Sequence, residues 1–324
     1  MTAEIRQVLV IQAGTIAEFV LSLTAMKRIR VAHPRARITL LTIPQFEGLA
    51  KASPYFNDVW TTGHPGSPGE WLALRGEIKR ARFSRVYDLE SSGWSKFLFH
   101  MLRPFPPAWS GAARGARLRY ANAEREQMHT LERQAQQLQV AGIWPDAPTQ
   151  PGDAPGPDLG WIVRRAPSPR PVPGGAAPRP FVLLVPGGGE GRPEKRWPIR
   201  HYAELASLLR GRGYDIVVVG GPQESSMARV IQKAVGQARD LTGRTDFAQI
   251  AVLGARAALA VGNNTGPMHL IAAAGAPTIA LVVDGPDSMI TAPRGHVAVL
   301  QAATLAELSV QTVATAAWSL LPRP

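Results

Sequence analysis

The sequence predicts an α/β protein built from two parallel-sheet domains. In both halves of the chain, short apolar segments alternate with amphipathic segments of helical length, a pattern typical of βαβ units. The chain has 324 residues, which is enough for two domains of ordinary size. Its apolar fraction of 45% is sufficient to fill two hydrophobic cores.

The first half begins with a buried strand, Gln7–Ile11 (QVLVI), followed by a turn at Gly14. Glu18 stands at the start of the next helix, which is expected to end near His33 and Pro34. The remaining elements expected here are, in order, a strand over Ile38–Thr42, a helix over Pro44–Lys51, a strand over Asp58–Thr61, a loop over Gly63–Gly69, a basic helix over Trp71–Arg82, a strand over Val86–Leu89, a break over Arg103–Pro107 and a polar helix over 121–141.

The composition changes abruptly between Pro145 and Pro180, where Pro, Gly and Ala dominate. Such a composition predicts a long linker or hinge. One apolar island inside it, Leu159–Val163, is expected to form an edge strand. The predicted organisation is a first Rossmann-like domain over 1–150, a Pro/Gly-rich linker over 151–180 and a second Rossmann-like domain over 181–324.

The second half repeats the alternation, starting with strand FVLLVP at Phe181, which leads into three glycines. The elements expected after it are a helix over Ile199–Arg212, a strand over Asp215–Val219, a helix over Glu224–Val235, a strand near Arg239–Leu241, a helix over Asp246–Gly254, a strand over Ala257–Val261, a helix over Met268–Ala274, a strand over Thr278–Val282 and a terminal amphipathic helix over Leu305–Leu321.

The absence of cysteine excludes disulfides and cysteine-based zinc sites and fits a reducing compartment. The apolar run Val8–Ile11 is too short for the core of a signal peptide. The longest apolar run, Leu270–Val283, is interrupted by Gly275 and Pro277, so no membrane-spanning helix is expected. These features predict a soluble, cytoplasmic protein.

The formal net charge is +12, and residues 1–145 carry most of it, with 19 Lys and Arg against 11 Asp and Glu. Basic proteins attract nucleic acids, anionic membrane surfaces or anionic substrates. A tight cluster of Arg114, Arg117 and Arg119 lies in this half. Nucleic-acid binding is the weakest of these hypotheses, because the chain lacks a recognition motif and its basic residues are spread over an α/β scaffold.

The stretch Val261–Pro277 (VGNNTGPMHLIAAAGAP) is the one on which the functional prediction depends. A strand ends at Gly262, a polar turn follows, and Pro267 opens an apolar helix that Gly275 closes. A strand–turn–helix of this kind directs free backbone N–H groups and the positive end of the helix dipole at one point, which suits a phosphate. An ordinary βα turn is an equally good interpretation of this stretch alone.

Two further loops of the second half follow strands, and ligands of open parallel sheets bind beyond the carboxyl ends of the strands. The first contains Gly188 and Gly189, which allow close backbone approach, and Lys195, which suits phosphate charge. The second contains Glu224, which could bind a pair of ribose hydroxyls or simply favour the first turn of a helix. His269, one turn inside the apolar helix, is either a core residue or a ligand contact.

Glu18 occupies a comparable place in the first half, at a helix start beyond Gly14. A carboxylate there could accept a proton from a substrate hydroxyl, or it could serve only the helix dipole. We expect it to face the cleft between the domains. A dinucleotide site is disfavoured, since GTIAEF lacks the second and third glycines of GxGxxG.

Three segments of the chain resemble glycosyltransferase family 9, the ADP-heptose:lipopolysaccharide heptosyltransferases. They are VLVIQAGTIAEFVLSLTAMKRI with HPRARITLLT, KRWPIRHYAELASLL with VVVGGPQE, and GNNTGPMHLIAAAGAPTIAL. The last is the most specific, because the family usually shows a DTGPMHLAAALG-like string. The resemblance implies the GT-B fold, in which two Rossmann-like domains face an interdomain cleft, with acceptor bound to the first domain and nucleotide-sugar donor to the second.

The resemblance also implies roles for individual residues. Glu18 matches the catalytic carboxylate, usually an aspartate, and Asn264 matches an aspartate. The substrate-binding positions that it implies are Lys195 for phosphate, Glu224, Asn264, Thr265, Gly266, His269 and Met268, which lines the nucleoside pocket, with Gly188 and Gly189 in the phosphate loop. Arg114, Arg117 and Arg119 are expected to face an anionic glycolipid acceptor at the inner membrane, where the protein would make peripheral contact.

The implied activity is inverting transfer of a sugar, heptose from ADP-heptose first of all, to an anionic lipopolysaccharide-core acceptor, with no metal and no cofactor. Two alternatives stay open. One is a family-9-like transferase with another donor, or with a protein or polysaccharide acceptor. The other is a catalytically impaired nucleotide-binding relative, a hypothesis that the replacements at Glu18 and Asn264 motivate.

Overall fold

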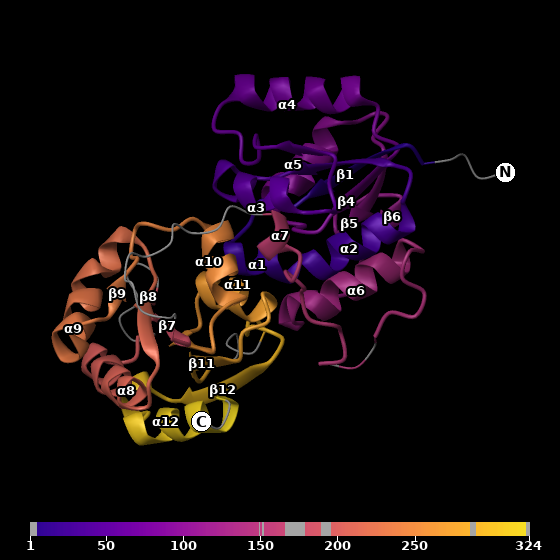
Figure 1. Ribbon diagram of the computed structural model, residues 1–324. Coiled ribbons are helices and arrows are strands. Elements are labelled where there is room, and N and C mark those ends of the chain that lie inside the picture. Colours follow the sequence, from indigo (N-terminus) through magenta and orange to yellow (C-terminus); the bar gives the residue numbers. More distant parts are fainter. Residues whose placement is uncertain are drawn as a thin grey trace. The chain divides into compact units, whose positions relative to one another are not determined.

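The computed structural model describes residues 5–148, 150, 152–165, 179–188, 196–285 and 290–321. Its contacts divide the chain into two compact units, Met1–Pro157 (unit 1) and Asp158–Pro324 (unit 2). Figure 1 shows unit 1 in indigo to magenta and unit 2 in pink through orange to yellow. Each unit has its own sheet and its own hydrophobic core.

The described residues of unit 1 form a six-stranded parallel sheet in the order β3-β2-β1-β4-β5-β6. The strands are β1 (Gln7–Ile11), β2 (Arg37–Leu41), β3 (Asp58–Trp60), β4 (Arg85–Asp88), β5 (Ala108–Gly111) and β6 (Leu118–Arg119). The helices are α1 (Ile16–Leu21), α2 (Leu23–Ala32), α3 (Glu47–Ala52), α4 (Pro68–Ala81), α5 (Gly93–Met101) and α6 (Thr130–Val140), with short 3-10 turns η1 (Pro44–Phe46) and η2 (Arg125–Gln127).

Unit 2 repeats this topology, with a six-stranded parallel sheet of its described residues in the order β12-β11-β10-β7-β8-β9. The strands are β7 (Phe181–Val185), β8 (Asp215–Val218), β9 (Arg239–Asp240), β10 (Leu259–Asn263), β11 (Thr278–Val283) and β12 (Val297–Ala302). The helices are α7 (Ile162–Arg165), α8 (Ile199–Gly211), α9 (Ser225–Val235), α10 (Phe247–Gly254), α11 (Gly266–Ala273) and α12 (Val310–Leu320), with 3-10 turns η4 (Pro222–Glu224) and η5 (Leu305–Glu307).

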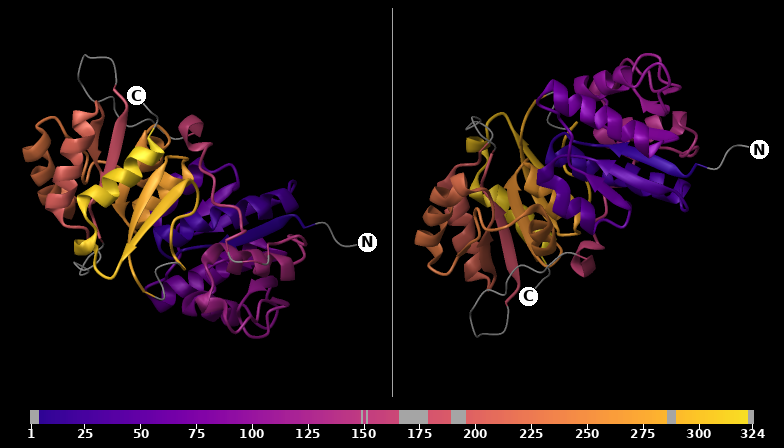
Figure 2. Two further views of the ribbon diagram at one scale, coloured as in Figure 1. Left: turned by 90° about the horizontal axis from the view of Figure 1, so that it is seen from below. Right: turned by 90° about the horizontal axis from the view of Figure 1, so that it is seen from above.

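Buried aromatic side chains anchor both cores. In unit 1 the ring of Phe99 packs edge-on against Trp109, with ring centroids 5.4 Å apart. In unit 2 Trp197 and Tyr202 are in edge contact at 4.9 Å, and α12 covers β11 beside α8. Figure 2 shows α12 in yellow lying along the strands of this sheet. Burial of such large apolar groups is the main source of each unit's stability.

The expected polar helix over 121–141 is shorter than the prediction, because α6 begins only at Thr130. The His129 side chain caps it by accepting a hydrogen bond from the Leu131 amide at 3.2 Å. Two of its four glutamines are buried: Gln134 donates to the Leu89 carbonyl at 3.2 Å, and Gln137 donates to the Asp88 carbonyl at 3.0 Å. Helix α6 is therefore hydrogen-bonded to the carboxyl end of β4, although its polar composition is typical of a helix exposed to solvent.

The apolar island Leu159–Val163 is not an edge strand. Residues Ile162–Arg165 form the single helical turn α7, and the Leu159 amide donates to the Ala273 carbonyl of α11 at 2.8 Å. The side chains of Leu159 and Ile162 are fully buried. These described residues of the predicted linker therefore pack onto unit 2, whereas residues 151 and 166–178 lie outside the described part of the chain.

Candidate functional site

Both sheets have the strand order of a Rossmann fold, so each has one point where the order reverses. In unit 1 this point lies between β1 and β4, and in unit 2 it lies between β7 and β10. Ligands of open parallel sheets bind beyond the carboxyl ends of the strands at such a point. The candidate ligand-binding regions are therefore the loops after β7 and β10 in unit 2 and the loops after β1 and β4 in unit 1.

In unit 2 the two loops are joined by Asn263, the last residue of β10, whose side chain is 1% exposed. Its amide nitrogen donates to the carbonyls of Pro186 (2.8 Å) and Gly187 (3.0 Å). Its amide oxygen accepts from the Trp197 backbone at 3.0 Å and from the Tyr202 hydroxyl at 3.1 Å. All four hydrogen-bonding positions of this amide are thus used inside the protein.

Asn263 was not among the predicted site residues, and only its place in the NN doublet could have drawn attention to it. Its neighbour Asn264 behaves in the opposite way. Within the described residues, the buried oxygen Oδ1 of Asn264 and the buried hydroxyl of Thr265 make no hydrogen bond. Thr265 is the N-cap of α11 but makes no capping bond with its side chain. Buried polar atoms without partners are costly, so these two atoms are suited to a ligand.

The N-terminus of α11 starts at Gly266 and has Pro267 in its first turn, as predicted. Inside the helix, the side chains of Met268 and His269 are buried, at 0% and 2% exposure. A Cβ atom on Gly262 would lie 2.5 Å from the Met268 sulfur, so this glycine allows Met268 to pack beneath the loop. The contact of Met268 with a nucleoside stays a prediction.

Glu224 lies in the loop after β8, the strand next to β7, and is 4% exposed. Its oxygen Oε2 accepts from the Gly221 amide at 2.6 Å, which closes a capping box on η4. Glu224 therefore caps the start of this helical turn, which is one of the two roles considered from the sequence. Its carboxyl group also lies 3.1 Å from the position that a Cβ atom on Gly187 would occupy. The structure brings the ends of β7, β8 and β10 together at one edge of the sheet.

Of the three residues predicted for the phosphate loop, the structure describes only Gly188. Gly188 packs against Arg196, whose Cγ would lie 2.4 Å from a Cβ at this position, so only glycine fits here. Gly189 and Lys195 lie outside the described residues.

In unit 1 Glu18 is in the first turn of α1 and forms a capping box with Thr15. Its oxygen Oε2 accepts from the Thr15 amide at 2.8 Å and from the Thr15 hydroxyl at 2.9 Å. Within the described residues, oxygen Oε1 accepts no hydrogen bond. The carboxylate is thus fixed through one oxygen, and its contact with a substrate stays a prediction.

The loop that carries Glu18 is held by two side chains that the sequence did not single out. The Ala13 amide donates to Glu90 Oε2 at 3.0 Å, and the His64 ring nitrogen Nε2 donates to the Ala13 carbonyl at 2.9 Å. Glu90 Oε1 accepts from the Trp94 indole at 2.7 Å, and the His64 ring lies against that indole with centroids 4.9 Å apart. Both backbone groups of Ala13 are therefore fixed from other elements, an arrangement we call the Ala13 clamp.

Two more charged groups surround the carboxyl ends of β1 and β4. Burial raises the pKa of Asp88 to about 6, although hydrogen bonds from the Ser91 amide and the Ser95 hydroxyl act against that rise. Burial also lowers the pKa of Arg133 on α6, helped by Arg125, while the negative charges of Glu126 and Glu18 oppose this lowering. Arg133 is thus a cation in the electrostatic field of Glu18 that the sequence did not reveal.

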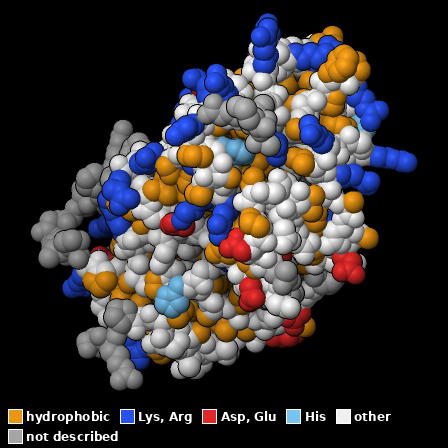
Figure 3. Space-filling model, turned by 90° about the vertical axis from the view of Figure 1, so that its right-hand side faces the viewer, with side chains coloured by type: hydrophobic (Ala, Val, Ile, Leu, Met, Phe, Trp, Pro, Cys, Tyr) orange, Lys and Arg blue, Asp and Glu red, His pale blue; other side chains and the backbone are white. Residues whose placement is uncertain are grey.

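The predicted basic cluster lies in the loop after β5 (Arg114, Arg117) and on β6 (Arg119), and all three of its residues are exposed. Within the described part of the chain, their guanidinium groups make no hydrogen bond or ion pair, so they are available to an anion. Figure 3 shows Lys and Arg side chains spread over the upper part of one face, with Asp and Glu side chains lower on it. The structure places no member of this cluster in contact with Glu18.

Among the described residues, no group of three or more His, Cys, Asp or Glu side chains is arranged to hold a metal ion. The same residues include no helix with the length and hydrophobicity that a bilayer crossing requires.

Two Rossmann-type sheets, with a carboxylate at one switch point and a helix N-terminus suited to an anion at the other, are compatible with an α/β enzyme that binds an anionic ligand. The model of glycosyltransferase family 9 (heptosyltransferase) matches residues 71–301. The chain belongs to this family.

A sequence relative agrees with this membership, and solved structures share the fold. The chain is 26% identical over 314 residues to lipopolysaccharide heptosyltransferase 2 of Escherichia coli (strain K12), which covers 90% of this chain and 86% of that protein. Its fold matches the structure titled E. coli ADP-heptose lps heptosyltransferase II with a TM-score of 0.77 at 21% identity, covering 97% and 98% of the two chains. A family 9 glycosyltransferase from Veillonella parvula has a TM-score of 0.78 at 19% identity, covering 99% and 98%.

Proposed function

We propose that this enzyme is an inverting glycosyltransferase that moves a sugar, heptose from ADP-heptose first of all, onto an anionic lipopolysaccharide-core acceptor. The observation that carries the proposal is the pair of uncommitted buried atoms, Asn264 Oδ1 and Thr265 Oγ1, at the N-terminus of α11. They lie at the switch point of unit 2, where the family's nucleotide-sugar is expected. The names of the relatives supply the donor and the acceptor class.

In the proposed reaction, an acceptor hydroxyl attacks the anomeric carbon while the bond from that carbon to the diphosphate oxygen breaks. The hydroxyl proton passes to Glu18, whose Oε1 accepts no hydrogen bond within the described residues, while Oε2 stays on Thr15. Negative charge develops on the leaving diphosphate, and the backbone N–H groups and dipole of α11 stabilise it. We also assign Lys195 to this charge, as the resemblance implies.

The acceptor side of the proposal rests on the charge of unit 1. Arg114, Arg117 and Arg119 are exposed and uncommitted within the described residues, and Arg133 adds a partly buried cation near Glu18. Such groups suit phosphate or carboxylate substituents of a glycolipid. They also support peripheral contact with an anionic membrane at the cytoplasmic side.

The test is a transfer assay with ADP-heptose and a deacylated lipopolysaccharide-core oligosaccharide, read by the mass of the product. Glu18→Gln preserves the size of the side chain and its cap, yet removes the base, so kcat should fall by about 100-fold or more. Activity near that of the parent enzyme would remove Glu18 from the mechanism. Inversion is checked by the anomeric configuration of the product in a proton NMR spectrum.

The replacement of aspartate by Asn264 favours one alternative, a different donor, because it removes a negative charge close to the donor diphosphate. Thermal shifts with ADP, GDP, UDP and their sugars separate the cases, and preference for UDP or GDP argues against heptose transfer. A second alternative is an impaired nucleotide-binding relative. Tight ADP binding without turnover, not rescued by Glu18→Asp combined with Asn264→Asp, would favour it.

A further inference from the structure

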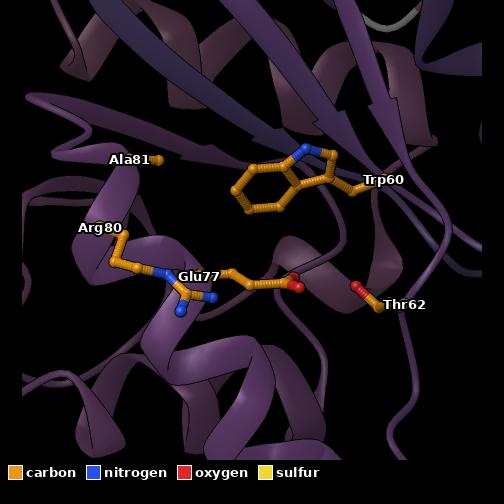
Figure 4. Close-up of a pocket in the computed structure, with 5 residues that line it drawn as sticks. All are labelled: Trp60, Thr62, Glu77, Arg80 and Ala81. Atoms are coloured by element: carbon orange, nitrogen blue, oxygen red, sulfur yellow. The ribbon is translucent and has the colours of Figure 1, made fainter.

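A pocket of about 530 Å³ opens beside β3, the edge strand of the first sheet. Trp60 and Thr62 line it from the end of β3 and the loop beyond, and Glu77, Arg80 and Ala81 line it from the second half of α4. Figure 4 shows these five side chains around the opening. None of the residues that the sequence or the family resemblance singles out lies in this pocket.

Two of the lining residues, Trp60 and Thr62, lie at the carboxyl end of β3, the edge of the parallel sheet at which β1 leads to Glu18. The others come from the last turns of α4, which lead back to the start of β4. The loop that leaves β3 also connects the two places directly. It carries Thr62 at the pocket, and two residues later His64, which donates to the Ala13 carbonyl at 2.9 Å in the Ala13 clamp. The loop after β3 is thus shared by the pocket and by the segment that precedes Glu18.

The aromatic wall of the pocket is fixed in position. Trp60 is half-buried, and its ring packs edge-to-face on the buried Phe83 with centroids 5.5 Å apart. In Figure 4 the Glu77 carboxylate and the Thr62 hydroxyl lie on the same side of the indole ring. An indole held in this way presents a flat apolar surface next to hydrogen-bonding groups.

The polar groups of the pocket are uncommitted. Although Glu77 and Arg80 are one helical turn apart on α4, their side chains make no hydrogen bond or ion pair with each other or with any other described residue. A second pocket of about 370 Å³ on the other side of Trp60 differs in this respect. There Asp58 accepts two hydrogen bonds from Arg37, and Asn57 accepts one from Arg30.

We propose that the first pocket binds a sugar unit of the acceptor, at a distance from the hydroxyl that reacts. The indole of Trp60 would receive the apolar C–H face of the sugar ring, and Glu77 and Arg80 would accept from and donate to adjacent ring hydroxyls. Arg80 also suits a carboxylate or phosphate substituent on that unit. The inference rests on the proposed function in one respect, namely that the acceptor is a glycan.

The test uses the full-length enzyme and four variants. Glu77→Gln and Arg80→Ala each remove one polar contact at a solvent-accessible side chain, and Trp60→Leu removes the aromatic surface while keeping an apolar group against Phe83. The matched control is Lys79→Ala, which removes an exposed cation of α4 that does not line the pocket. Each protein is titrated with deacylated lipopolysaccharide-core oligosaccharide, and separately with ADP, by isothermal calorimetry.

We expect the first three variants to weaken oligosaccharide binding by about tenfold each, with ADP binding and kcat at saturating acceptor unchanged. Lys79→Ala should bind both probes as the parent enzyme does. Unchanged oligosaccharide affinity in all three pocket variants, with normal transfer by the parent enzyme, would overturn this inference and leave the proposed function intact. Oligosaccharide binding that depends on the pocket, in an enzyme that transfers no sugar, would support the pocket and count against the proposed reaction. Loss of ADP affinity in Trp60→Leu would instead show a nucleotide site here and refute the assignment to a sugar.

Discussion

The carboxylate of Glu18 is folded back onto Thr15, accepting from its amide at 2.8 Å and from its hydroxyl at 2.9 Å. A Cβ atom on Gly14 would lie 2.5 Å from the same carboxylate oxygen, Oε2. The absence of a side chain at Gly14 thus leaves room for the Glu18 carboxylate to cap Thr15. The capping role and the proposed catalytic role do not compete, because they use different oxygens.

Gly14→Ala should therefore impair catalysis more than stability. The atom that the new methyl group meets is the end of a flexible side chain, which can rotate away and leave Thr15. We expect the free energy of unfolding to change by less than about 1 kcal/mol, while kcat falls by about tenfold or more through the displaced base. Urea denaturation and the transfer assay measure the two effects, and a variant with parent-like kcat would show that the position of Glu18 is not critical.

Glu90 offers a prediction about the Ala13 clamp. Each of its oxygens accepts one hydrogen bond, from the Ala13 amide and from the Trp94 indole. Glu90→Gln has one acceptor oxygen and an NH₂ group that cannot accept, so one donor loses its partner. We expect a loss of about 1–3 kcal/mol in stability, together with a lower kcat because the loop that carries Glu18 is loosened. A stability loss with kcat unchanged would restrict the clamp to a structural role.

Neighbouring asparagines should respond in opposite ways to the same substitution. Asn263→Asp places a carboxylate oxygen against the carbonyl oxygens of Pro186 and Gly187, where the amide now donates, and should cost about 3 kcal/mol or more. Asn264→Asp adds a negative charge next to the N-terminus of α11, which the helix dipole tolerates. Thermal unfolding of the two variants side by side measures the difference, and equal stability would contradict the described hydrogen bonds of Asn263.

The raised pKa of Asp88 predicts that the free energy of unfolding depends on pH. Its folded-state pKa is raised to about 6 by burial, above the ordinary value of 3.8, so the folded state binds a proton that the unfolded state releases between these values. Stability should then decrease as the pH rises through this window, by about 1 kcal/mol between pH 5 and pH 7. Asp88→Asn should lack this contribution.

His33 has the opposite effect on stability in the same pH range. Burial lowers its pKa to about 4, so the folded state binds fewer protons than the unfolded state, and this contribution to stability increases as the pH rises. The informative quantity is therefore the difference in unfolding free energy between the parent and Asp88→Asn at each pH, measured by urea titration. A difference that does not vary between pH 5 and pH 7 would contradict the assignment to Asp88.

Much of the fold follows from the sequence, because buried parallel strands are short apolar runs between helical patterns. Gln7–Ile11 is predicted and observed as β1, and the helix expected after the NNTG turn is observed as α11. Helix α5 (GWSKFLFHM) and strand β12 (VAVLQA) escaped prediction although both are largely apolar segments. Two other missed elements have weak local signals. Strand β5 (AWSG) follows two prolines and contains a glycine, and β6 has only two residues.

The candidate site was predicted less completely than the fold. The sequence locates Glu18, Glu224 and the Asn264–Gly266 turn, since each follows a strand. It does not reveal Glu90 and His64, which meet Ala13 only because β4 and the loop after β3 lie beside β1. Nor does it separate Asn263 from Asn264, because only the tertiary arrangement decides which amide is satisfied within the protein.

The strand order described for the first sheet also constrains how the newly made polypeptide folds. β1 occupies the centre of that sheet and pairs on one side with β4, where Val8 lies opposite Arg85. This edge of β1 can therefore be paired only after Arg85 has left the ribosome. Until then β1 has an unpaired edge that can bind other segments or other chains, and pairing between segments distant in the sequence is slow. Production of this enzyme should therefore depend on chaperones and on translation speed more than its final stability suggests.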